Sequence, residues 1–261
     1  MYKVWWRELW AFREVLAFLV WRDITVRYKQ TLLGVAWAVL QPLATMMIFT
    51  IFFGNLAKVP SDGIPYAVFT YSALTAWTFF TTAVVSASNS LITNQNLVSK
   101  VYVPRIMIPG AAILSFVPDF IVSSLILLVL MLFYGVPLSW TFLWWPVLLV
   151  PVILLAFAFG LILSALNVRY RDIKYVVPFA MQLLLFATPV IYPISLVPEK
   201  YRALMALNPL TGLIDAFRAT ALHGRSIDWF LFGAGCGLTL LAVTIGMIYF
   251  RNAEQTFADT I

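Results

Sequence analysis

Residues 31–57 read TLLGVAWAVLQPLATMMIFTIFFGNLA and contain no Asp, Glu, Lys or Arg. A helix needs about 20 mostly apolar residues to cross the hydrocarbon core of a bilayer, so this run is long enough to span it. Comparable runs occupy residues 64–99, 106–135, 136–168, 175–198 and 229–250, and only the second of these holds a charged residue, Asp119. The sequence therefore predicts an all-α integral membrane protein with six transmembrane helices.

The composition supports this class. Hydrophobic residues make up 62% of the 261-residue chain and charged residues 11%, against about 45–50% and about 25% in soluble domains. So few charges could not cover a soluble surface, which excludes a soluble enzyme, and the single cysteine, Cys236, excludes a disulfide scaffold. We expect one transmembrane domain over residues 1–261, with an interface region at 1–30, a six-span bundle at 31–250 and a cytoplasmic tail at 251–261.

The distribution of basic residues predicts the orientation. Lys and Arg gather in the cytoplasmic loops of membrane proteins. With the N-terminus inside, twelve of the 17 basic residues lie in cytoplasmic segments, and the outer segments hold Lys58, Lys200, Arg202, Arg218 and Arg225. Both termini are thus expected in the cytoplasm, and the net charge of +6 is attributed to topology, with no nucleic-acid partner.

The N-terminal region has one apolar helical face. Trp5, Leu9, Phe12, Leu16 and Leu19 are spaced by 4, 3, 4 and 3 residues, which places them on one side of a helix. This pattern predicts an amphipathic helix lying on the cytoplasmic surface of the membrane. The alternative is a helix that packs this face against a neighbouring helix.

The segment 188–228 lies between the fifth and sixth expected spans. It is too polar for another pair of spans and too apolar for a free loop, and it is rich in proline. We expect short re-entrant helices that dip into the outer leaflet and form an outer gate. The gate residues are predicted to be Pro189, Tyr192, Pro193, Asn208 and Pro209.

Motifs for chemistry are missing from the sequence. It has no G-x-x-x-x-G-K-[ST], H-E-x-x-H or G-x-S-x-G, and its one histidine, His223, has no second metal ligand nearby. We therefore expect a protein that is not an enzyme, with no catalytic residues, no metal site and no cofactor of its own. Asp119 is the one acidic residue deep in a span, and it serves either a structural pairing or transport.

A polar stripe follows the second span. It comprises Tyr71, Thr75, Thr78, Thr82, Ser86 and Asn89, spaced as one helical face. Together with Gln41 and Thr45 of the first span, Gln182 of the fifth, and the aromatic residues Trp37 and Phe186, it predicts the lining of a transport pathway. The alternatives are hydrogen bonding between helices for the polar residues and core packing for the aromatic ones.

Two rows of small residues predict close helix contacts. One row is Gly233 and Gly237, and the other is Ala156, Gly160 and Ser164. Each row fits a contact within one chain or between two copies, and the sequence leaves both open.

Residues 27–43, RYKQTLLGVAWAVLQPL, closely resemble the start of the permease subunit of bacterial polysaccharide ABC exporters, a group within the type-2 ABC permeases. Asn208-Pro209-Leu210 followed by Phe217-Arg218 is similar to the pattern of that family's outer loop. The resemblance in layout covers the whole chain.

The resemblance implies partners, a location and a substrate. It implies a homodimer of this chain in the bacterial inner membrane, with two copies of a separate ABC ATPase subunit that bind ATP and magnesium. The substrate implied is a lipid-linked polysaccharide of the O-antigen, capsule or teichoic acid type. The family's coupling loop would correspond to residues 94–105, and the coupling residues would be Gln95, Asn96, Lys100, Tyr102 and Arg105, flanked by Arg169 and Arg171.

Three other functions remain open at this point. A type-2 ABC permease for a drug or small lipid would share the fold and the ATPase. A secondary carrier would work without an ATPase, and Asp119 would be its candidate for ion coupling. A structural membrane scaffold is the third, against which the patterned outer segment argues.

Overall fold

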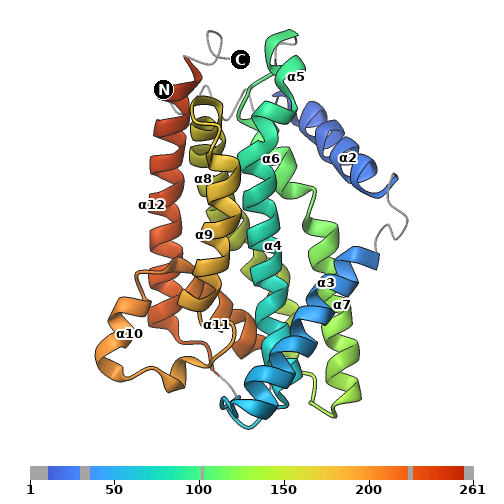
Figure 1. The fold of residues 1–261 in the computed structure, drawn as a ribbon, viewed down its shortest axis with the longest axis vertical. Coiled ribbons are helices and arrows are strands. Elements are labelled where there is room, and N and C mark those ends of the chain that lie inside the picture. The colour runs from blue at the N-terminus through green and yellow to red at the C-terminus, as the bar shows by residue number, and fades with distance from the viewer. Residues whose placement is uncertain (1–10, 30–35, 101–102, 223–225, 256–261) are drawn as a thin grey trace.

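A computed structural model of the chain describes residues 11–29, 36–100, 103–222 and 226–255. These residues fold into a bundle of helices joined by loops, which confirms the all-α class (Figure 1). In chain order the elements are α2 (Arg13–Lys29), α3 (Ala36–Phe49), η1 (Thr50–Leu56), α4 (Tyr66–Thr93), α5 (Gln95–Lys100), α6 (Met107–Leu114), α7 (Val117–Phe133), η2 (Trp140–Trp144), α8 (Trp145–Arg169), α9 (Ile173–Ala187), η3 (Ile194–Leu196), α10 (Glu199–Met205), α11 (Pro209–Ala221) and α12 (Trp229–Glu254).

Within the described residues, five helical stretches are long and apolar enough to cross a membrane. They are Ala36–Leu56, Tyr66–Thr93, Met107–Phe133, Trp140–Arg169 and Trp229–Glu254, and they match five of the six expected spans. The remaining expected span, 175–198, corresponds to α9, an apolar helix of 15 residues that ends at Ala187. Since about 20 residues are needed to cross the bilayer, the six-span count stays a prediction.

Helix α4 is the centre of the bundle. In its most apolar stretch 78% of the residues are buried within the chain, against 11% in Ala36–Leu56 and 22% in Trp229–Glu254. It packs closely on α8, because a Cβ added to Gly160 would lie 2.8 Å from the Cβ of Ala87. The row that contains Gly160 thus packs within the chain, whereas a Cβ on Gly233 or Gly237 would meet no heavy atom within 4 Å.

The helices of the bundle distribute between its two ends. Helices α2 and α5 and the C-terminal end of α12 lie toward one end, and α10 and α11 lie toward the opposite one (Figure 1). The first described helix, α2, and the C-terminal end of the last, α12, thus lie toward the same end of the bundle.

Helix α2 uses its apolar face differently from the expectation. Leu19 is buried in a cluster with residues of α6, and Phe12 and Leu16 pack against the same cluster. This is the packing that the sequence left as the alternative to a membrane-facing side. The large apolar residues exposed on α2 are instead Phe18, Trp21 and Val26, and residues 1–10 lie outside the described chain.

The segment after α9 contains the short helices η3, α10 and α11, as expected. All residues of α11 from Leu210 to Ala221 are buried, and α11 packs against α12, α4 and α8. Gly212 permits this packing, since a Cβ there would lie 2.0 Å from the carbonyl oxygen of Leu231 in α12. Re-entry of this segment into the membrane remains a prediction.

Candidate functional site

The polar stripe of α4 faces two adjoining cavities. Cavity one, with a volume of about 170 Å³, lies between α2, α3, α4 and α7. Five of the predicted pathway residues line it: Trp37, Gln41, Thr75, Thr78 and Thr82. Four further lining residues were not part of the pathway prediction: Arg27, Tyr28, Phe116 and Asp119. The wall of cavity one is therefore mixed aromatic and polar.

Cavity two continues the stripe toward the end of α4. Its volume is about 470 Å³, and it is lined by Ser86 and Asn89 of α4 and by Gln182 of α9. Thr82 and Phe116 line both cavities. The stripe from Thr75 to Asn89 thus forms one polar track with a cavity at each end.

The hydrogen bonds of Thr75 and Thr82 in this track lie within α4 and do not link it to another helix. The hydroxyl of Thr75 donates to the carbonyl of Tyr71 at 2.9 Å, and that of Thr82 donates to the carbonyl of Thr78 at 2.7 Å. Both are bonds to the preceding turn of the same helix, and they leave the hydroxyl oxygens able to accept a hydrogen bond. The threonine oxygens are thus free to serve as acceptors in cavity one.

Asn89 does take part in a link between helices. The Nδ2 of Asn167 in α8 donates to the carbonyl of Ser88 at 2.8 Å and to Oδ1 of Asn89 at 3.1 Å. Hydrogen bonding between helices, the alternative considered from the sequence, therefore accounts for this end of the track.

Asp119 is paired with Arg27. Nη1 of Arg27 lies 3.1 Å from Oδ2 of Asp119, the two side chains are 26% and 22% exposed, and the hydroxyl of Tyr28 donates to the other carboxylate oxygen. Burial lowers the pKa of Arg27 below its ordinary value, and the carboxylate of Asp119 opposes that shift. Of the two roles left open for Asp119, the structure shows the pairing.

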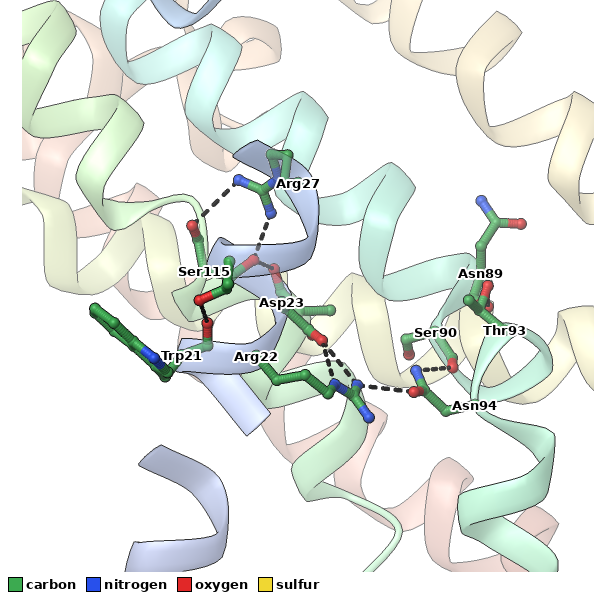
Figure 2. Close-up of polar contacts among 11 residues, drawn as sticks. Trp21, Arg22, Asp23, Arg27, Asn89, Ser90, Thr93, Asn94 and Ser115 are labelled. Carbon is green, nitrogen blue, oxygen red and sulfur yellow. Dashed lines mark hydrogen bonds and ion pairs between the residues drawn. The ribbon is translucent and has the colours of Figure 1, made fainter. Parts of the chain in front are cut away.

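Arg27 also bonds to the break between α6 and α7. It donates to the carbonyl of Ser115 at 3.2 Å and to its hydroxyl at 2.6 Å (Figure 2). Its guanidinium carbon lies 3.5 Å from the ring centroid of Phe116. Carbonyls at the end of a helix lack partners within the helix, and Pro118 brings no N–H to the next one. Arg27 thus ties α2 to a point where the backbone of the third span is interrupted.

Arg27 and Tyr28 were missed as site residues because Arg27 was interpreted only as part of the charge pattern that predicts topology. The available signal was Asp119, since an acidic residue within a span needs a cationic partner. The sequence could not say which of the nearby cations supplies it.

Three predicted pathway residues lie elsewhere. Tyr71 is fully buried and lines neither of these cavities. Thr45 is half-buried on α3, where its hydroxyl donates to the carbonyl of Gln41. Phe186 lines a third cavity, of about 660 Å³, beside α10 and α11. The structure therefore divides the predicted pathway into a polar track and a separate, mostly apolar cavity.

The third cavity gathers predicted gate residues. Tyr192, Asn208 and Pro209 line it with Phe186, and Pro189 and Pro193 are buried in the chain between α9 and η3. The hydroxyl of Tyr192 donates to the carbonyl of Phe186 at 3.2 Å. The predicted gate residues thus lie around one connection.

The predicted coupling residues gather at the end of the bundle that holds α2 and α5. Gln95, Asn96, Arg169 and Arg171 are exposed, and Nη1 of Arg105 donates to the carbonyl of Glu254 in α12 at 2.7 Å. Tyr102 and the side chain of Lys100 lie outside the described residues.

A hydrogen bond joins α2 to the predicted coupling loop. Nη2 of Arg22 donates to Oδ1 of Asn94 at 2.8 Å, and Arg22 also pairs with Asp23 (Figure 2). Helix α2 is therefore bonded at one point to the junction of α4 and α5, and through Arg27 to the wall of cavity one.

Comparisons with known proteins identify the family of the chain. A family model described as ABC-2 type transporter matches residues 14–222, which include all three cavities. The chain belongs to this family. It is thus a multi-pass membrane protein of the ABC-2 type.

Relatives of this ABC-2 transporter cover nearly its whole length. It is 29% identical over 257 residues to the O-antigen export system permease protein RfbA of Myxococcus xanthus, with 98% of each chain covered. It is 26% identical over 249 residues to an RfbA protein of the same description from Klebsiella pneumoniae, with 95% of each covered. It is 23% identical over 244 residues to the polysialic acid transport protein KpsM of Escherichia coli, covering 90% of this chain and 91% of that one.

Proposed function

We propose that this chain is the transmembrane subunit of an ATP-driven exporter that moves a lipid-linked polysaccharide, of the O-antigen, capsule or teichoic acid type, across the bacterial inner membrane. The observation that carries the proposal is the polar and aromatic track along α4, in a chain whose near full-length relatives are named for O-antigen export and polysialic acid transport. Both termini are assigned to the cytoplasm.

The chemistry of the track suits a sugar chain. Aromatic rings such as Trp37 and Phe116 pack against the apolar faces of sugar rings, and hydroxyl and amide groups such as Thr78 and Gln41 exchange hydrogen bonds with sugar hydroxyls. The charges of cavity one are neutralised in the Arg27–Asp119 pair. A nearly uncharged wall holds a polymer weakly, so the polymer can move.

The ATPase is assigned to a separate subunit. We infer a homodimer of this chain with two ATPase copies, which bind ATP and magnesium, at the end of the bundle that carries Gln95, Asn96, Arg169 and Arg171. Movement of residues 94–105 would reach α2 through the Arg22–Asn94 bond and cavity one through Arg27. The lipid-linked end enters sideways from the inner leaflet, and residues 188–225 gate the outer side.

A permease for a drug or small lipid is the second candidate, because the third cavity has a mostly apolar lining. A secondary carrier loses its main support, since Asp119 is already paired with Arg27.

The test is the ATPase activity of the complex. The chain is co-expressed with a candidate ABC ATPase subunit, and hydrolysis is measured in proteoliposomes with lipid-linked polysaccharide, with small amphiphiles and with neither. Stimulation by the polysaccharide alone is expected. Stimulation by small amphiphiles alone would favour the second candidate, and failure of every ABC ATPase to bind would overturn the exporter assignment.

A further inference from the structure

The connection between α9 and η3 is buried without being helical. We call residues 188–193 the outer linker. Thr188, Pro189, Val190, Ile191 and Pro193 are buried in it. Buried backbone groups outside helices need hydrogen-bond partners, above all in a membrane protein, where lipid supplies none. The groups that hydrogen-bond to the backbone of this linker therefore determine its position.

Two side chains from different helices hold consecutive carbonyls of the outer linker. Nη2 of Arg218 in α11 donates to the carbonyl of Val190 at 2.9 Å. The hydroxyl of Tyr66, in the first turn of α4, donates to the carbonyl of Ile191 at 2.7 Å. The linker is thus fastened to the central helix of the bundle and to α11 at the same time.

Arg218 is an unusual residue for this place. Its side chain is fully buried, with its guanidinium carbon 3.9 Å from the ring centroid of Phe69. Burying a charged side chain is costly, and an apolar side chain of similar volume would fill the same space without that cost. Arg218 donates a hydrogen bond to the carbonyl of Val190, which an apolar side chain could not do.

Further bonds fasten the two ends of the same region. Nδ2 of Asn208, the residue before α11, donates to the hydroxyl oxygen of Thr188 at 2.9 Å. The hydroxyl of Ser195 donates to Oδ1 of Asp62 at 2.8 Å, in the loop between η1 and α4. The outer linker is therefore bonded near both ends as well as at its centre.

We propose that Arg218 and Tyr66 are positioning residues that hold the outer linker in its closed position, and that the linker leaves them when substrate passes. The second half of this proposal rests on the proposed function, because it concerns what passes. The first half concerns the resting protein alone. Loss of one hydrogen bond of ordinary strength shifts the balance between held and released linker by about two- to tenfold.

The experiment uses the full permease–ATPase complex in proteoliposomes, with Cys236 replaced by Ala. A spin label is attached at Leu196, the last residue of η3 and three positions after the linker, or at Tyr249 in α12 as a distant reference. Both positions are exposed. Tyr66→Phe removes one hydroxyl and keeps the ring. Arg218→Gln removes the charge and places its amide nitrogen two covalent bonds short of the position of Nη2, so the bond to Val190 is lost. Thr211→Val is the matched control, since it removes a buried hydroxyl of α11 that has no hydrogen-bond partner among the described residues.

We expect Tyr66→Phe and Arg218→Gln to increase label mobility at position 196 but not at 249, and Thr211→Val to change neither. Arg218→Lys, which keeps the charge and has a donor that reaches further than that of Gln, is expected to restore part of the restraint. Unchanged mobility at 196 in Tyr66→Phe would overturn the proposal, and so would an equal increase at both positions, which indicates general loosening. If Arg218→Gln does not insert, Tyr66→Phe decides alone.

A second readout follows substrate passage. The polysaccharide exported per ATP hydrolysed should change in Tyr66→Phe and stay unchanged in Thr211→Val, and equal ratios would overturn the gating half. The label measurement needs no polysaccharide. Failure of the proposed function would appear instead as missing stimulation of the unaltered complex by polysaccharide.

Discussion

The ion pair between Arg27 and Asp119 can be tested by a double-mutant cycle. Asp119→Asn removes the charge but keeps an oxygen that can accept from Tyr28. Arg27→Met removes the cation and keeps much of the side-chain volume. The two changes, made singly and together, measure how strongly α2 is tied to the third span.

The structure sets the expected magnitudes. An exposed ion pair contributes about 0.2–1 kcal/mol, and removing one partner of a fully buried pair costs about 3–5 kcal/mol. With the side chains 26% and 22% exposed and 3.1 Å apart, the coupling energy should be about 1–2 kcal/mol, between these limits. Arg27→Met should cost more than Asp119→Asn, because it also removes two bonds to Ser115 and the contact with Phe116.

The assay is equilibrium unfolding of the purified protein in mixed detergent micelles, with the free energy of unfolding compared across the four proteins. Arg251→Met, which removes an exposed cation from the last turn of α12, is the control and should stay within about 0.5 kcal/mol of the unaltered protein. A coupling energy under about 0.5 kcal/mol, the usual error of additivity, would refute the inference that this pair fastens α2 to α7.

Three further predictions concern packing, the track and the partner surface. Gly212→Ala should prevent close packing of α11 on α12 and lower the melting temperature, because its Cβ would lie 2.0 Å from the carbonyl oxygen of Leu231; an unchanged melting temperature would contradict that packing. Trp37→Ala should reduce polysaccharide export severalfold while the melting temperature stays nearly constant, because Trp37 is 56% exposed and lines cavity one; full export would remove it from the track. Replacing the exposed Gln95 and Asn96 by Ala should reduce co-purification of the ATPase without affecting membrane insertion, and undiminished co-purification would place its docking surface elsewhere.

The position of the apolar helices and the residues that share one helical face could be predicted from the sequence. Long apolar runs mark five helices that are long enough to cross a membrane, since length and hydropathy are local properties. The helical spacing of Thr75, Thr78 and Thr82 correctly placed these residues on one face, and the structure puts that face on cavity one. Tyr71 shares the face but lies one turn further along, where other helices cover it. Periodicity gives a face of a helix but not the point at which its neighbours begin.

The remaining differences arise from tertiary packing. An apolar helical face can be covered by lipid or by protein, so the spacing of Phe12, Leu16 and Leu19 could not decide between them. The end of α9 at Ala187 could not be predicted, because the apolar run 175–198 continues past it without a change in composition. The buried, non-helical residues that follow carry the same kind of apolar side chains as a membrane span. The bonds of Arg27 to Ser115 and Asp119 join residues about 90 positions apart, and no local pattern predicts them.

The position of α3 at the edge of the bundle affects how wide cavity one can become. Within Ala36–Phe49 only Pro42 and Met46 are buried, whereas α4 is enclosed over most of its length. A sideways shift of α3 would therefore break few buried contacts, while a shift of α4 would disrupt the core. Trp37, Gln41 and Pro42 form the α3 wall of cavity one. A shift of α3 relative to α4 would therefore change the volume of this cavity from its present 170 Å³. Sugars of different girth could be accommodated on the same scaffold without repacking its interior.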